Sequence, residues 1–121
     1  MRLFALRGAT TVERNTSDEI LGATETLMRE IMSRNVLEPE DVVSCLFTLT
    51  EDLDAQFPAV AARQLGFAQV PLMCAREVPV PGSLPHVIRV LMHYYAADDH
   101  VAKHVYLGEA RKLRMDLESA Q

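Results

Sequence analysis

The sequence predicts a mixed α/β fold in which a small sheet packs against helices. Three observations predict it: a long amphipathic helix pattern begins at a capping signal, short β-branched runs alternate with helical patterns, and proline- and glycine-rich turns separate them. The chain has 121 residues and is 49% apolar. We therefore expect a single domain over residues 1–121 with one hydrophobic core.

The N-terminal part predicts a strand and then a helix. Weak alternation over residues 2–7 is typical of a strand, which a turn over residues 8–11 would end. Thr16 and Glu19 have the spacing of a capping box, so a helix is expected to begin there and to continue to about Asn35. Its buried stripe comprises Ile20, Leu21, Thr24, Leu27, Met28, Ile31 and Met32.

The middle of the chain predicts a strand, a short helix and a second strand. The nearly continuous apolar run over residues 42–49 is typical of a strand that is covered on both faces. Pro58 is suited to the first turn of an alanine-rich helix, which Gly66 would stop. A strand is expected over residues 67–74, with Pro71 indicating an edge or a bulge because proline has no N–H to donate.

The last third predicts a loop, a third helix and a final strand. Prolines and a glycine make residues 79–82 a rigid loop, after which Ser83 is expected to cap the helix. The buried stripe of this helix would comprise Leu84, Val87, Ile88, Leu91, Met92 and Tyr95. A strand over residues 104–113, broken at Gly108, completes the order β-α-β-α-β-α-β and a mixed sheet.

The charge disfavours a nucleic-acid partner and allows a small anion. The net charge is −5, whereas nucleic-acid binders collect positive charge on one face. Ten of the twelve basic residues are arginine, whose planar fork suits carboxylates and phosphates. Taken alone, however, the base composition of the genome is the better explanation of this bias. A chain this short has little material for a deep pocket of its own, so a ligand site would need a second subunit.

The cysteines and the apolar runs predict a cytoplasmic protein without a membrane partner. Cys45 and Cys74 are too few and too distant for a disulfide scaffold, so we expect free thiols in a reducing compartment. Arginines interrupt the short apolar stretch over residues 1–7, and no stretch approaches the length of a membrane span.

The common catalytic motifs are absent from the sequence. There is no GxxxxGK[ST], GxGxxG, GxSxG or HExxH. His100 and His104 have a spacing that could bind a metal from one helix face, but without a third ligand we expect a solvated pair and no metal. His86 and His93 would lie on the polar side of the predicted third helix, without a role.

Four charged residues lie where the pattern makes polarity awkward: Arg7, Arg63, Glu77 and Arg89. Taken singly, each has an ordinary explanation, such as a loop ion pair or an arginine that lays its stem on the core. Cys74 would by default be a small buried residue and Tyr106 a strand aromatic.

As a set, however, these residues have a family resemblance. The blocks that carry it are Leu6-Arg7-Gly8-Ala9-Thr10-Thr11-Val12-Glu13, Phe57-Pro58-Ala59 with Arg63, Cys74 with Glu77, Val87-Ile88-Arg89-Val90, and His104-Val105-Tyr106-Leu107. Over nearly the whole chain the sequence resembles the monofunctional chorismate mutases of the trimeric mixed α/β class, which differ from the all-helical class.

The resemblance implies an isomerase that converts chorismate to prephenate on the route to phenylalanine and tyrosine. It also implies a homotrimer with a barrel-like core and with three active sites at the subunit interfaces. Neither a cofactor nor a metal is implied. The missing motifs agree with this activity, because a unimolecular rearrangement needs no nucleophile and no proton shuttle.

The resemblance also implies roles for particular residues. Arg89 would donate hydrogen bonds to the ether oxygen of the breaking bond and to a substrate carboxylate. Arg7 would bind the side-chain carboxylate of the substrate, and Glu77 would accept a hydrogen bond from its ring hydroxyl. The other residues that would contact the substrate are Phe57, Arg63, Met73, Cys74, Ala75, Arg76, Tyr106, Leu113 and Arg114. Among these, Tyr106 would hold a carboxylate and Cys74 would adjoin the ring hydroxyl.

Two positions depart from the family pattern, and two other functions stay open. Val60 stands where some members carry a charged residue, and Met115 stands where a proline often begins the tail, which is expected to be mobile over residues 115–121. A trimeric enamine deaminase would lack the opening block and the Arg89 block. A module that binds an aromatic acid without turnover would keep Arg7 and Arg63 but need neither Glu77 nor Arg89.

Overall fold

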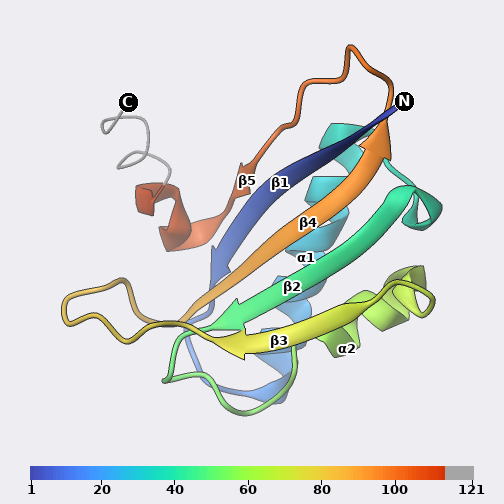
Figure 1. Ribbon diagram of the computed structural model, residues 1–121. Helices are drawn as coiled ribbons and strands as arrows, with labels where there is room; N and C mark the ends of the chain where they lie inside the picture. Colours follow the sequence, from blue (N-terminus) through green and yellow to red (C-terminus); the bar gives the residue numbers. More distant parts are fainter. Residues whose placement is uncertain (114–121) are drawn as a thin grey trace.

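The computed structural model, which describes residues 1–113, shows a five-stranded mixed sheet with helices behind one face (Figure 1). The elements are β1 (Arg2–Thr11), α1 (Ser17–Asn35), β2 (Val42–Leu49), α2 (Ala59–Ala62), β3 (Leu72–Arg76), β4 (Val87–Ala96) and β5 (Val105–Tyr106). The strands lie in the order β3-β2-β4-β1-β5. Because β4 is antiparallel to β1 and β2, whereas β2 is parallel to β3 and β1 to β5, the predicted mixed α/β class is confirmed.

Helix α1 begins and ends where the sequence predicts. The Thr16 hydroxyl accepts a hydrogen bond from the Glu19 amide at 3.2 Å, and Val36 ends the helix with a left-handed φ of 53°. The Glu19 carboxylate does not complete a capping box, since it accepts from the amides of Glu13 and Arg14 instead. The predicted stripe is largely buried and packs against the sheet.

The predicted turn at Gly8 is wrong, because β1 continues through it to Thr11. Gly8 lies on the face of the sheet that α1 covers. A Cβ there would lie 2.7 Å from Cδ1 of Ile31, so the glycine permits close packing of the helix rather than a turn.

The predicted third helix is also wrong, because its residues form β4, the middle strand of the sheet. Ile88, Val90 and Met92 face the helices, while Leu91 and Tyr95 lie on the opposite face and are exposed. Apolar residues on both faces disguised the two-residue period of a strand as a helical stripe. The Ser83 hydroxyl caps no helix but donates to the Val80 carbonyl within a turn.

The ends of three further elements differ from the prediction. The helix that begins with α2 continues as a wide turn over Arg63–Phe67, in which Gly66 has a φ of 99°, so this glycine marks the stop as expected. Phe67 is therefore not in a strand, and β3 begins only at Leu72, at the predicted sheet edge. Strand β5 has two residues, after which Gly108–Ala110 form a 3-10 turn and residues 111–113 are helical. The observed order is β-α-β-α-β-β-β.

Helices α1 and α2 both lie behind one face of the sheet, and the other face is the open face (Figure 1). Among residues 1–113, only the short helical segment that contains Ala110 and Leu113 packs on the open face, next to Ala9 and Val87. The main core lies between the other face and the helices, around Leu27, Phe47 and Tyr94. Across the open face, Arg7, Leu91, Leu46 and Met73 are neighbours in register, and so are Ala9, Arg89, Thr48 and Ala75. The large apolar residues exposed on this face are Leu3, Leu46, Met73, Leu91 and Tyr95.

No helix within residues 1–113 has the length and the apolar character needed to cross a membrane. The predicted tail over residues 115–121 lies outside the described residues.

Candidate active site

A cavity of about 580 Å³ lies on the open face of the sheet. Its lining comes from β1, β2, β4 and β5, from the residue directly after β3, and from a residue after the 3-10 turn that follows β5. The lining residues are Arg7, Gly8, Ala9, Leu46, Thr48, Glu77, Arg89, Val90, Leu91, Tyr106 and Leu113. A volume of this size is typical of sites for small molecules.

Glu77 and Arg89 form an ion pair in this cavity. Nε of Arg89 lies 3.1 Å from Oε1 of Glu77, and the Glu77 side chain is only 15% exposed. The Glu77 amide donates to the Leu49 carbonyl at 2.8 Å, which extends the pairing of β2 and β3 by one residue. The Thr48 hydroxyl donates to Oε2 of Glu77. Both carboxylate oxygens therefore have a partner.

Arg7 and Tyr106 approach the same cavity from β1 and β5. Arg7 is opposite Leu91 on β4, and Tyr106 is opposite Ala9 on β1. The Arg7 amide donates to Nδ1 of His104 at 2.9 Å, which helps to hold the short strand β5 against β1. The cavity thus combines two arginines and a phenol with an apolar wall. This combination suits a small anion that has an apolar body.

The structure brings five of the predicted site residues together and leaves the others elsewhere. Arg7, Glu77, Arg89, Tyr106 and Leu113 line the cavity. Six others within the described residues do not: Phe57, Arg63, Met73, Cys74, Ala75 and Arg76.

These six residues have different locations. Phe57 is 65% exposed just before α2, and Arg63 is exposed just after it. Met73 and Ala75 pair with Leu46 and Thr48, so they share the open face but lie nearer its edge. The Cys74 side chain packs against the core on the other face. Arg114 lies outside the described residues.

Arg76 contacts the protein backbone rather than the cavity. Its Nη1 donates to the carbonyl of Thr50 at 2.8 Å and to that of Leu53 at 2.6 Å. The guanidinium thereby fastens the turn after β2 to the end of β3.

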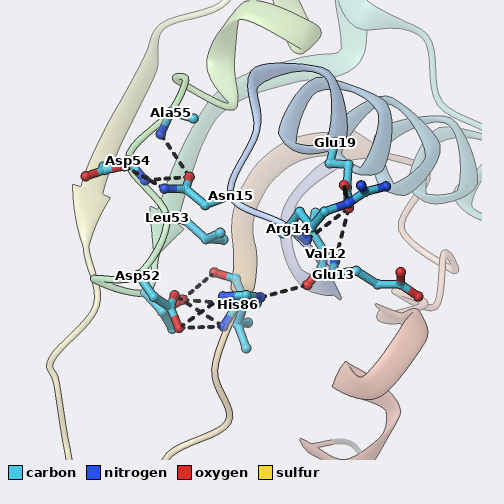
Figure 2. Close-up of polar contacts among 12 residues, drawn as sticks. Val12, Glu13, Arg14, Asn15, Glu19, Asp52, Leu53, Asp54, Ala55 and His86 are labelled. Carbon is cyan, nitrogen blue, oxygen red and sulfur yellow. Dashed lines mark hydrogen bonds and ion pairs between the residues drawn. The ribbon is translucent and has the colours of Figure 1, made fainter.

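Asp52 and His86 connect the ends of three strands next to the cavity (Figure 2). The Asp52 carboxylate accepts from the Thr50 hydroxyl at 2.5 Å and from the His86 amide at 3.0 Å. The His86 carbonyl accepts from the Val12 amide, and Nδ1 of His86 lies 3.2 Å from the Val12 carbonyl. Burial alone would raise the pKa of Asp52, but these hydrogen bonds and the charge of His86 lower it.

The predictions for the histidines change because the segment that was predicted as a third helix forms strand β4. His86 has the structural contacts just described, and His93 is on β4 near Ser44. His100 is not on a helix, and its Nε2 lies 2.7 Å from the hydroxyl of Tyr94, whose pKa is raised by burial. Residues 1–113 contain no cluster of three or more His, Cys, Asp or Glu that could hold a metal ion.

Both cysteines are free thiols, as the sequence predicts. Cys45 is buried in the core, and this burial raises the pKa of its thiol to about 12. Such a thiol is not a reactive nucleophile.

Sequence reasoning missed Thr48, Leu46 and Leu91 as cavity residues. Arg89 and Leu91 are two residues apart on β4, and Leu46 and Thr48 are two residues apart on β2, which is the spacing of one strand face. The wrong prediction of a third helix hid the first pair, and the prediction that strand 42–49 is covered on both faces hid the second.

Known proteins with similar sequences now decide the family. The family model described as chorismate mutase type I matches residues 3–117. A chorismate mutase AroH of Thermus thermophilus is 52% identical over 96% of this chain and 97% of its own length. The chain belongs to the type I chorismate mutases. A second chorismate mutase AroH, from Bacillus subtilis, is 45% identical to this type I chain over 97% of it and 94% of the relative.

A solved structure shares the fold. A chorismate mutase from Clostridium thermocellum has a TM-score of 0.87 and 50% sequence identity, over 90% of this chain and 98% of that one. The type I chorismate mutase described here is therefore an isomerase of aromatic amino acid biosynthesis that converts chorismate to prephenate, as the resemblance implied. The deaminase and the module without turnover do not fit this membership.

Proposed function

We propose that the rearrangement takes place in the cavity between Arg7, Glu77, Arg89 and Tyr106. The observation that carries this proposal is that two arginines from neighbouring strands reach one cavity together with a fixed carboxylate. Chorismate carries two carboxylates and a ring hydroxyl, so the cavity offers a complementary group for each kind of charge.

The reaction needs orientation and fixed charge. In chorismate the ether C–O bond breaks while a C–C bond forms within the same molecule, so no atom or proton passes to the protein. The site has to hold the flexible dianion in its compact form. It also has to place positive charge where the ether oxygen gains electron density. A million-fold acceleration requires about 8 kcal/mol of such stabilisation.

Arg89 has the role in which charge matters most. Its guanidinium is always protonated, so it can donate to the ether oxygen as negative charge develops there. The ion pair with Glu77 uses Nε, so it requires neither terminal nitrogen of the guanidinium. Arg7 and Tyr106 bind carboxylate, and Glu77 accepts a hydrogen bond from the ring hydroxyl through lone pairs that Thr48 and Arg89 do not use.

The cavity is completed in a homotrimer. Apolar residues cover the open face of the sheet, which a monomer would expose to water. Packing three such faces together makes a barrel-like core. In this assembly Phe57, Arg63 and Met73 of one copy lie at the cavity of the next copy, where Arg63 adds positive charge. The backbone of Cys74 and Ala75 continues along the same strand past the substrate, whereas the Arg76 side chain holds the Thr50 and Leu53 carbonyls. Arg114 adds charge at the rim. We place this homotrimer in the cytoplasm.

Mixed trimers test the shared site. The variants Arg63→Ala and Arg89→Ala, each inactive alone, are unfolded and refolded together in equal amounts, and loss of the chorismate diene absorbance is followed with the appearance of prephenate. If one copy supplies Arg89 and its neighbour Arg63, random mixing restores about a quarter of the wild-type activity. If both come from one copy, nothing is restored, which overturns the shared site. Sedimentation of the same samples reports the trimer independently.

A further inference from the structure

The hydroxyl of Thr48 lies where two functional side chains meet. Thr48 is on β2 directly opposite Arg89 on β4, and its hydroxyl donates to Oε2 of Glu77. Oε1 of the same carboxylate lies 3.1 Å from Nε of Arg89. Thr48 also lines the cavity itself.

The Glu77 carboxylate needs this second hydrogen bond because Glu77 directly follows an edge strand. Strand β3 ends at Arg76, and the chain then continues through a loop with three prolines and Gly82 before β4 begins. The Glu77 amide is anchored by the Leu49 carbonyl, but this bond does not fix the side chain. With Arg89 alone, the carboxylate could rotate about a single contact. The Thr48 hydroxyl removes that freedom by holding the second oxygen.

The Glu77–Arg89 pair is partly shielded from water, which strengthens the hydrogen bond from the Thr48 hydroxyl. The Glu77 side chain is 15% exposed, whereas that of Arg89 is 44% exposed. A hydrogen bond to a charged group that water does not readily replace is stronger than a bond between neutral groups. Branching at Cβ restricts χ1 of threonine, so few positions are open to its hydroxyl oxygen before a ligand arrives.

We propose that Thr48 is a positioning residue of the rearrangement. Its hydroxyl orients the Glu77 carboxylate for the substrate hydroxyl and, through Glu77, keeps the Arg89 guanidinium in place at the cavity. This inference rests on the proposed function of Glu77 and Arg89 in the same cavity. It assigns to β2 a part in a site whose charged groups come from β1, β4 and the end of β3.

Two substitutions at Thr48 separate the hydroxyl from the shape of the side chain. Thr48→Val replaces the hydroxyl by a methyl group, and Thr48→Ser keeps the hydroxyl. We expect Thr48→Val to lower kcat/KM roughly ten-fold and Thr48→Ser to stay within about two-fold of wild type. A matched control is Thr26→Val on α1, which removes a hydroxyl that donates to the Gly22 carbonyl at 3.0 Å far from the cavity and should leave kcat/KM unchanged.

A double-mutant cycle with Glu77→Ala shows whether Thr48 acts through Glu77. If it does, Thr48→Val has no further effect once the carboxylate is gone, because the two losses are not additive. An equal ten-fold loss in both backgrounds, or no loss in either, overturns the positioning role. An undiminished kcat/KM for Glu77→Ala alone contradicts the proposed function instead, so the two failures are distinguishable. If Thr48→Val does not fold, as judged by circular dichroism, Thr48→Ala takes its place in the cycle.

Discussion

Nε of Arg89 lies 3.1 Å from Oε1 of Glu77, and this ion pair joins the middle strand of the sheet to the residue that follows the edge strand. Strand β2 lies between them and supplies Thr48, whose hydroxyl takes the other carboxylate oxygen. In the proposed site, Glu77 thus holds the Arg89 side chain, and Thr48 on the strand between them holds Glu77. This arrangement prepares the site before a substrate binds, which is how an enzyme avoids reorganisation during the reaction.

Replacing Arg89 by citrulline should lower turnover far more than binding. Citrulline keeps the shape of arginine and loses its charge, so stabilisation of the developing charge on the ether oxygen disappears. We expect kcat to fall roughly 100- to 1000-fold and KM to change much less. Citrulline at Arg29, which forms an exposed pair with Glu25 on α1, is the control and should change neither. Equal losses in kcat and in affinity would remove the transition-state role of Arg89.

Replacing Arg76 by methionine should lower stability rather than substrate affinity. The change leaves the Thr50 and Leu53 carbonyls without the guanidinium that now donates to both. We expect Tm to fall by several degrees, since each lost hydrogen bond costs about 1 kcal/mol. Arg34→Met, at an exposed pair on α1, is the matched control. A raised KM at an unchanged Tm would instead place Arg76 against the substrate.

Gly8→Ala should destabilise the protein by about 1–3 kcal/mol, because the new methyl group overpacks the core. The Cβ would lie 2.7 Å from Ile31 Cδ1 and 3.2 Å from Leu27 Cδ1, on the helix that covers the sheet. Gly22→Ala on α1 is the control, since nothing lies within 4 Å of its Cβ. It should stabilise the protein by about 0.5–1 kcal/mol. Urea unfolding measures both, and an equal response at the two glycines would contradict the packing argument.

Asp52→Asn should reduce stability at neutral pH and leave it nearly unchanged in acid. The pKa of Asp52 is lowered from 3.8 in the folded chain, so its carboxylate favours folding above that value. This contribution is lost as the pH falls through the lower, folded pKa. The free energies of unfolding of wild type and variant should therefore converge below about pH 4. Asp99→Asn, at an exposed position, is the matched control and should leave the free energy of unfolding at neutral pH nearly unchanged. A difference that is constant with pH would exclude the carboxylate as its source.

Local patterns were enough wherever the structure is local. Helix α1 was predicted from Thr16 to Asn35, because its cap and its buried stripe are set by residues a few positions apart. The blocks around Arg7, Glu77 and Arg89 likewise indicated the family, and with it the mixed α/β class and the isomerase. These sequence blocks, however, did not show which of their side chains line the same cavity.

What the sequence by itself determined was helix α1, the fold class and the family, and through the family the residues that we propose for the site. The tertiary structure alone decided that residues 87–96 form the middle strand, because their two apolar faces pack differently and only one of them lies against α1 and α2. It alone decided that Gly8 serves packing rather than a turn. It also joined Thr48 to Glu77 across 29 residues of sequence. Such contacts depend on the register between strands, and register is fixed by the packing of the whole sheet rather than by any short pattern.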